Sequence, residues 1–144
     1  MSAKSFEIVA NLVDVVARKI TPAKICVSDG KIAKIESADS AERFIMPGFV
    51  DAHIHIESSM LLPSQFARAA VVHGTVATVS DPHEIANVCG LDGVELMLRD
   101  AERTCFHFNF GAPSCVPATQ FETAGAALDA AAVAKLLALS LIHI

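Results

Sequence analysis

From Pro47-Gly48 onward, short segments with strand character alternate with longer segments of helical periodicity. The patterns predict strands at residues 49–56, 75–79 and 106–110, and helices at residues 63–73, 91–103 and 129–139. This alternation predicts an α/β fold in which helices cover a parallel sheet, because each parallel connection needs a crossover. About three βα units fit into residues 47–139, whereas an eight-stranded barrel takes roughly 250 residues. The chain is therefore expected to hold either the first part of a barrel or an open three-stranded sheet.

The first 46 residues have a purely β character. Segments 7–16, 23–28 and 31–36 are rich in apolar and β-branched residues, and Asp29-Gly30 between the last two is a hairpin turn signal. These residues predict a small meander that is too short to be a complete domain.

Charge and composition narrow the range of partners. The 144 residues carry a formal net charge of −5, so no basic excess is present to neutralise a phosphate backbone, and we expect no nucleic-acid partner. Mean hydropathy is high, at +0.48, but Asp129 and Lys135 interrupt the most apolar stretch. What remains is shorter than the ~20 residues of a spanning helix, so no membrane association is expected. The N-terminus lacks an apolar signal segment, and the four cysteines form no C-x-x-C pair, which predicts a cytoplasmic protein with reduced thiols.

The sharpest motif, Asp51-Ala-His-Ile-His-Ile-Glu57, ends the first predicted strand. Side chains alternate between the two faces of a strand, so His53 and His55 are expected to project from one face, together with Asp51 and Glu57. Two imidazoles at this spacing can bind one metal ion. We predict His53 and His55 as metal ligands, and two buried, hydrogen-bonded histidines are the alternative. The opposite face, which suits a helix-covered surface, holds Val50, Ala52, Ile54 and Ile56.

A second polar cluster, Ser80-Asp-Pro-His-Glu84, directly follows the second predicted strand. The carboxyl ends of parallel strands form one rim, so this cluster is expected beside the two histidines. Asp81 and Glu84 can orient a ligand or move protons, and His83 can bind metal or substrate. The alternative is a helix capping box between Asp81 and Glu84, and the two interpretations are compatible.

A third segment, Ala112 to Thr119, follows the last predicted strand and is expected on the same rim. It is interpreted as a pocket-lining loop or as a plain loop with two prolines. No base lies near Cys115 in the sequence, so a catalytic thiol is not predicted. His73 and His107 are assigned structural roles.

Together these motifs resemble those of the amidohydrolase superfamily. Met46-Pro-Gly-Phe-Val-Asp-Ala-His-Ile-His55 resembles its first-strand signature. Narrower strings resemble the bacterial adenine deaminases within it: Glu57-Ser-Ser-Met60, Ser80-Asp-Pro-His-Glu-Ile-Ala-Asn87 and Pro113-Ser-Cys-Val-Pro-Ala-Thr119. The resemblance covers about residues 8–139.

The resemblance implies hydrolytic deamination of adenine to hypoxanthine and ammonia by a metal-activated water. It implies a TIM-like (β/α)8 barrel flanked by a small β-sandwich, with residues 1–46 as part of the sandwich and residues 47–139 as the first βα units. His53 and His55 match the family's first-strand ligands for manganese or iron, with zinc also possible. Asp81, His83 and Glu84 match a motif on the rim and are assigned to catalysis. The small molecule adenine is the expected partner, and the full-length protein is expected to be a homo-oligomer.

The sequence also departs from the family pattern. The later strands and their metal ligands are absent, and residues 140–144 do not resemble a family continuation, so we expect a truncated or non-native tail. The chain alone is expected to be inactive and, because its strand edges lack partners, to associate or dissolve poorly. Two alternatives stay open: another cyclic amidohydrolase, of the dihydroorotase or imidazolonepropionase kind, or a non-catalytic α/β domain.

Overall fold

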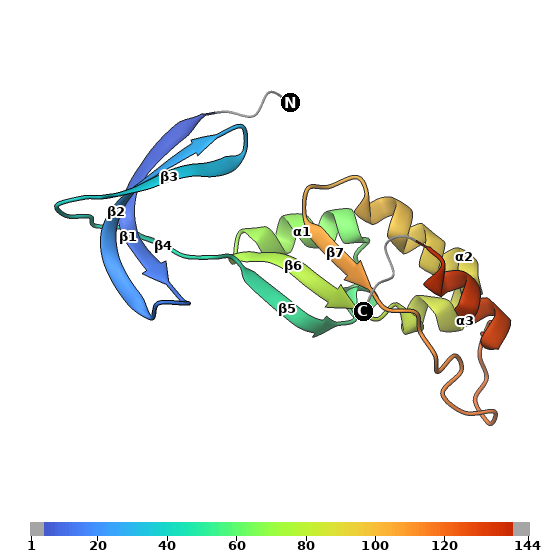
Figure 1. Cartoon of the computed structure of the whole chain (residues 1–144). Coiled ribbons are helices and arrows are strands. Elements are labelled where there is room, and N and C mark those ends of the chain that lie inside the picture. Colours follow the sequence, from blue (N-terminus) through green and yellow to red (C-terminus); the bar gives the residue numbers. More distant parts are fainter. Residues whose placement is uncertain (1–4, 140–144) are drawn as a thin grey trace. The chain divides into compact units, whose positions relative to one another are not determined.

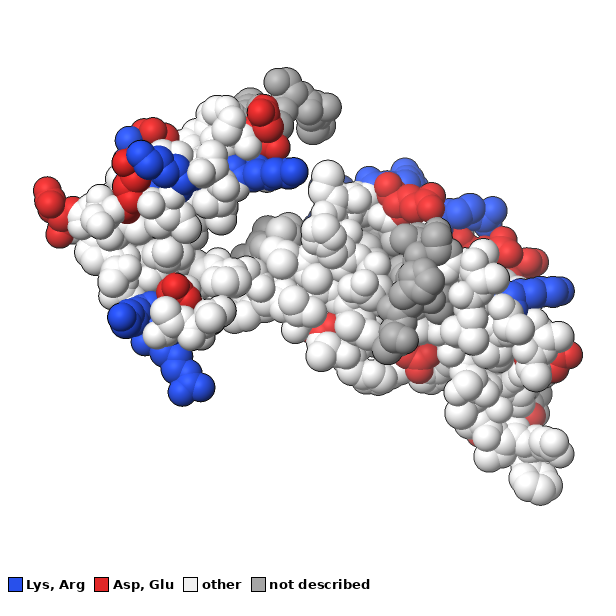
Figure 2. All heavy atoms as spheres, in the orientation of Figure 1, with Lys and Arg blue, Asp and Glu red and all other residues white. Residues whose placement is uncertain are grey.

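The computed structural model describes residues 5–139, and its contacts divide the chain after Pro47 into two compact units (Figure 1). The tail expected at residues 140–144 lies outside the described range. Among residues 5–139, no helix combines the length and the apolar character that crossing a bilayer requires. On the face drawn in Figure 2, the described Lys and Arg side chains lie among Asp and Glu side chains rather than in one basic stripe.

The first unit is a four-stranded sheet in the order β3-β2-β1-β4. Its strands are β1 (Phe6–Asp14), β2 (Lys19–Ser28), β3 (Lys31–Ser37) and β4 (Phe44–Ile45). The first three are antiparallel neighbours, and β4 lies parallel to β1. Positive φ angles at Asp29 and Gly30, 52° and 74°, confirm the predicted hairpin turn. The described residues of this unit form one sheet, so the β-sandwich stays a prediction.

Two strand ends in this unit differ from the sequence prediction. β1 stops at Asp14 rather than residue 16, because the Asp14 carboxylate accepts hydrogen bonds from the backbone of Val16 and Ala17 and turns the chain. β2 begins at Lys19, four residues earlier than predicted, because pairing with β1 continues through Pro22 to Lys19. Strand pairing therefore overrides the local signals of proline and threonine.

The second unit has the predicted α/β character. Its parallel sheet has the order β5-β6-β7, with β5 (Phe49–Ile54), β6 (Thr75–Ser80) and β7 (His107–Phe110). The short 3-10 helix η1 (Ile56–Ser59) and helix α1 (Pro63–Val71) connect β5 to β6, helix α2 (His83–Ala101) connects β6 to β7, and α3 (Ala130–Leu137) follows the loop after β7. Both crossovers advance in one direction along the sheet, so right-handed connections place α1 and α2 on the same face (Figure 1).

Helix α2 shows the largest error of the sequence prediction. It begins at His83, not at residue 91, and continues across a kink at Gly90, whose φ and ψ are 62° and −142°. A residue with a side chain is strained at that φ, so glycine lets two helical segments join there. The polar motif at residues 83–84 thus forms the first turn of a helix. The last helix begins as predicted, because Asp129 accepts a hydrogen bond of 2.8 Å from the backbone of Ala132.

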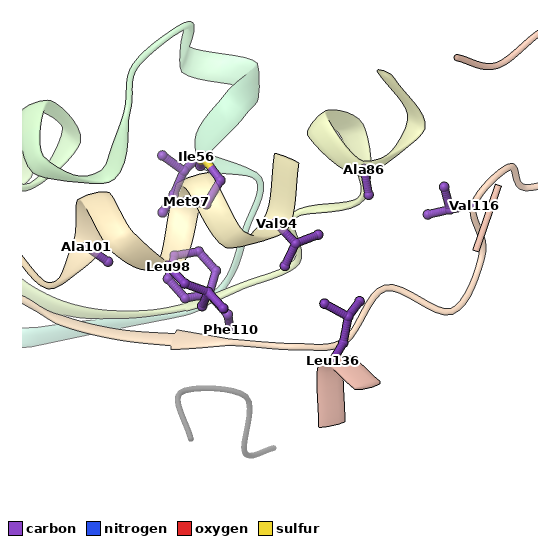
Figure 3. Packing of buried hydrophobic residues seen from close by; sticks show 9 residues of the cluster. All are labelled: Ile56, Ala86, Val94, Met97, Leu98, Ala101, Phe110, Val116 and Leu136. Atoms are coloured by element: carbon purple, nitrogen blue, oxygen red, sulfur yellow. The ribbon is translucent and has the colours of Figure 1, made fainter. Parts of the chain in front are cut away.

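A compact apolar core holds the helices of the second unit against its sheet (Figure 3). Phe110, Val94 and Ile56 are fully buried in it, and Leu136 connects α3 to the same cluster. Ile54 and Ile56 face the helices as predicted. The prediction is wrong for Val50 and Ala52, which are exposed because β5 is an edge strand of the described sheet.

A buried carboxylate also fixes α1 to α2. Asp100 on α2 accepts a hydrogen bond of 2.7 Å from the backbone N–H of Ser64, in the first turn of α1, and one of 3.1 Å from Arg103. Burial by itself raises the pKa of Asp100, but the hydrogen bonds from Ser64 and the charge of Arg103 outweigh it and hold the pKa below its ordinary value. Asp100 therefore stabilises the folded chain in its ionised form.

We expect Asp100→Asn to lower the free energy of unfolding by about 1–3 kcal/mol at pH 7, measured by urea denaturation of the 144-residue chain. Because the folded pKa is depressed, the stabilisation is complete above the ordinary pKa of an aspartate and disappears as the pH falls through the folded pKa. The difference in the free energy of unfolding between the unmodified chain and the variant should therefore shrink below about pH 4. Asp92→Asn, an exposed change on the same helix, is the control and should have little effect. Equal effects of the two changes would contradict the role of Asp100.

Candidate functional site

The two polar motifs of the second unit meet where β5 and β6 end. Ile54 pairs with Ser80 in the sheet, and the backbone N–H of Asp81 donates a 3.0 Å hydrogen bond to the carbonyl oxygen of Ile54. His55 and Asp81 therefore leave the sheet side by side, although 26 residues separate them in the chain. The structure brings both predicted clusters together at the carboxyl ends of β5 and β6.

His53 and His55 point their rings at one another. Their Nε2 atoms are 3.2 Å apart, and the two rings are nearly perpendicular. The Nδ1 atom of His55 lies 2.9 Å from the carbonyl oxygen of Asp81. A carbonyl can only accept, so Nδ1 donates this hydrogen bond, and the tautomer with its proton on Nδ1 presents Nε2 as an acceptor or metal ligand. His53 is exposed and His55 is partly buried, so the alternative of two buried histidines is wrong.

His83 and Glu84 complete a compact group of donor atoms with His55. One ligand atom from each of these three residues lies within 4.8 Å of the others. The His83 ring is 4.6 Å from the His55 ring, centroid to centroid, and its Nδ1 lies 3.0 Å from Oδ2 of Asp81. The described residues thus hold a possible His/Glu metal site, which contains one predicted ligand and two residues predicted as catalytic.

The capping-box alternative for Asp81 and Glu84 is wrong. Helix α2 begins at His83 with Pro82 as its N-cap, and no side chain caps it. The Asp81 carboxylate binds His83 instead, and Oε1 of Glu84 accepts a 2.7 Å hydrogen bond from the Ser58 hydroxyl. Both acidic side chains are therefore directed at the site rather than at the helix backbone.

Residues that the sequence left without a role surround this group. Glu57 lies in η1, beyond the end of β5, so the predicted strand alternation does not place it; its Oε1 accepts a 3.4 Å hydrogen bond from the backbone of Ile85. Ser58 binds Glu84, and Asn87 lies one helical turn after His83. The resemblance strings contained all three residues, and the spacing of four between His83 and Asn87 was the local signal that could have indicated a shared face.

Four acceptor oxygens near the group are buried without a hydrogen-bond partner among residues 5–139. They are Glu57 Oε2, Asp81 Oδ1, Glu84 Oε2 and Asn87 Oδ1. A buried acceptor that lacks a donor costs about 1–3 kcal/mol. A divalent cation or a ligand rich in N–H groups would satisfy such oxygens.

A cavity of about 510 Å³ opens beside the group. His53, Asp81, His83 and Asn87 line one side of it, and the loop after β7 contributes the other, including Pro113, Ser114 and Cys115. The segment 112–119 is thus a pocket-lining loop as predicted. The volume is in the range of ordinary small-molecule sites. His107, an exposed residue at the start of β7, and His73, after α1, do not line this cavity.

Comparison with known proteins identifies the class to which this fold and site belong. The model of the amidohydrolase family matches residues 44–140, which contain the whole site, and the chain belongs to that family.

Within the family, the chain is similar to proteins named adenine deaminase. It is 63% identical over 134 residues to that of Salinibacter ruber, 61% over 132 residues to that of a Sulfurovum species, and 50% over 141 residues to that of Borreliella burgdorferi. These matches cover 92%, 91% and 96% of this chain. They cover 25%, 25% and 26% of the relatives, so the chain spans about a quarter of their length.

Proposed function

We propose that this chain contributes part of the metal site and one wall of the substrate pocket of an adenine deaminase, which hydrolyses adenine to hypoxanthine and ammonia. The observation that carries the proposal is the group His55, His83 and Glu84, with His53 beside it, at the ends of β5 and β6. The similarity to three adenine deaminases supports adenine as the substrate class.

The donor set fits a divalent transition metal. Imidazole nitrogen together with carboxylate oxygen suits manganese, iron and zinc. Two nitrogen ligands of a tetrahedral zinc, each at roughly 2.0–2.1 Å, are about 3.3 Å apart. The Nε2 atoms of His53 and His55 are separated by 3.2 Å, and the proton on Nδ1 of His55 leaves its Nε2 free to bind. We assign His53 and His55 as ligands of manganese or iron, with zinc as a third candidate.

Such an ion, when bound, lowers the pKa of water so that hydroxide is available at neutral pH. The chain's own residues supply the proton transfers that the reaction also needs. Adenine must gain a proton on a ring nitrogen and another on the departing amine, and we assign both transfers to Glu84. The Ser58 hydroxyl holds one of its oxygens, and the other accepts no hydrogen bond from residues 5–139. Asp81 fixes the tautomer and the orientation of His83 through Nδ1, so that Nε2 of His83 can accept a hydrogen bond from the substrate.

We also propose that residues 47–139 begin a (β/α)8 barrel and that residues 1–46 belong to a β-sandwich. The order β5-β6-β7 with parallel pairing is the order in which barrel strands are added. Sites in such barrels form at the carboxyl ends of the strands, where both motifs lie. Further strands would cover the exposed edge of β5.

A hybrid enzyme tests the proposal. Residues 1–139 of this chain replace the matching segment of the Salinibacter ruber adenine deaminase, which is 63% identical over 134 residues. We expect the hybrid, loaded with manganese or ferrous iron, to convert adenine to equal amounts of hypoxanthine and ammonia, measured by chromatography and an ammonia assay. We expect the 144-residue chain alone to show no turnover.

The unmodified Salinibacter ruber protein is the positive control, and dihydroorotate and an imidazolone are the comparison substrates. A folded, metal-loaded hybrid that releases no ammonia from adenine would contradict the proposal. Hydrolysis of a comparison substrate in place of adenine would favour another cyclic amidohydrolase.

A further inference from the structure

Asn87 lines the same cavity as His53 and His83 and takes no part in the candidate metal group. It lies four residues after His83 on α2, so the two side chains project from the same face of the helix. Both line the cavity of about 510 Å³. Four residues of helix, a rise of roughly 6 Å, separate their positions along the helix axis.

The backbone and the side chain of Asn87 have separate roles. Its carbonyl oxygen accepts hydrogen bonds of 2.8 Å and 3.1 Å from the backbone of Gly125 and Ala126, which fixes the loop after β7 to α2. Its side-chain Oδ1 is buried and accepts no hydrogen bond from residues 5–139. The loop contact survives a change of side chain, so the buried amide is free to serve a ligand.

A primary amide presents an acceptor beside donors. Such an amide can form two hydrogen bonds with a ring edge on which an N–H group lies beside an unprotonated nitrogen. Free adenine has such an edge, formed by N9–H and N3. For hydrolysis, C6 of the base must face the group at His55, His83 and Glu84. The N3/N9 edge lies across the purine ring system from C6, so a base held at this edge by Asn87 directs C6 away from the amide.

We propose that Asn87 binds the N3/N9 edge of the purine and thereby selects the free base over bases substituted at N9. The inference rests on the proposed deaminase function and adds a specificity-determining residue to it. Oδ1 accepts from N9–H, and the amide N–H donates to N3. A substituent on N9 removes the donor and leaves the buried Oδ1 without a partner, which a polar site penalises strongly.

The test compares adenine with 9-methyladenine in the hybrid enzyme. We expect unmodified hybrid to prefer adenine by at least about 100-fold in kcat/KM. Asn87→Ala should lower kcat/KM for adenine by about 10- to 100-fold, mainly through KM, and leave the value for 9-methyladenine nearly unchanged. The preference for adenine should therefore collapse. Gln120→Ala removes an amide from the loop after β7, at a residue that does not line the cavity, and is the control that should keep the preference.

The ratio of the two substrates separates recognition from a structural role. If Asn87→Ala lowers kcat/KM for both substrates equally, or for neither, the inference is overturned. If the unmodified hybrid folds and holds metal but does not turn over, the deaminase proposal fails. In that case, calorimetry measures the affinity of the metal-loaded hybrid for adenine and for 9-methyladenine, which tests Asn87 separately. Equal affinity of the unmodified hybrid for the two bases would overturn the inference.

Discussion

Replacing His55 with alanine is expected to abolish tight manganese binding by the hybrid enzyme and to lower kcat/KM for adenine by about 10³-fold or more. His55 is the best connected residue of the site. Its Nε2 is 3.2 Å from Nε2 of His53, its Nδ1 binds the Asp81 carbonyl oxygen, and its ring is 4.6 Å from that of His83. The change therefore removes the donor common to the predicted ligand pair and the compact group. Metal content after gel filtration and steady-state kinetics give the two readouts.

Two further variants make this result specific. His73→Ala removes a histidine that lies outside the cavity and should leave both metal content and kcat/KM unchanged. His53→Ala removes one of the two proposed ligands and keeps His55, so we expect weaker metal affinity with part of the binding retained. Stoichiometric metal in the His55→Ala protein would contradict the proposed site.

Local sequence signals were sufficient to predict most of the strands and helices of the second unit. The β-branched segment after Gly74 predicted β6 to within one residue, and Asp129 marked the start of α3. The first turns of α2 were missed because the apolar helical spacing begins only at residue 91, whereas residues 80–84 are a polar cluster without that spacing. The kink at Gly90 joins the two segments, since glycine tolerates its φ of 62°. Whether a helix continues through such a glycine depends on the packing of both segments.

The site was predictable where a backbone rule places side chains. The shared carboxyl end of the parallel strands brings His55 and Asp81 together, and His53 lies in β5 beside them. His55 itself follows the last residue of β5, so the strand alternation predicted for residues 49–56 does not place its side chain. The contacts of Glu57 and Ser58 were not predictable in this way. They depend on η1 facing the first turn of α2, which is a tertiary contact between segments about 26–28 residues apart. No periodicity in the sequence reports such a contact.

Those contacts show how the fold prepares Glu84. The chain leaves β5 through η1, and two hydrogen bonds then connect η1 to the start of α2: Ser58 with Glu84, and Glu57 with the backbone of Ile85. Because η1 is anchored by the fully buried Ile56, the position of Glu84 depends on the core as well as on its own helix. A positioning role therefore follows for Ser58, distinct from the proton transfers assigned to Glu84.

Glu84→Gln is expected to lower kcat for adenine by about 10²- to 10⁴-fold, because glutamine keeps the shape of the side chain and cannot carry a proton. If Glu84 acts in proton transfer, the variant should keep the metal content of the unmodified hybrid, since His53 and His55 remain. Ser58→Ala should have a smaller effect, about 10-fold or less, because it removes only one hydrogen bond of 2.7 Å to the carboxylate. Steady-state kinetics and metal analysis of the two variants distinguish the roles. Loss of metal from Glu84→Gln would make Glu84 a ligand, as its place beside His55 and His83 also permits, and an unchanged kcat would remove it from the mechanism.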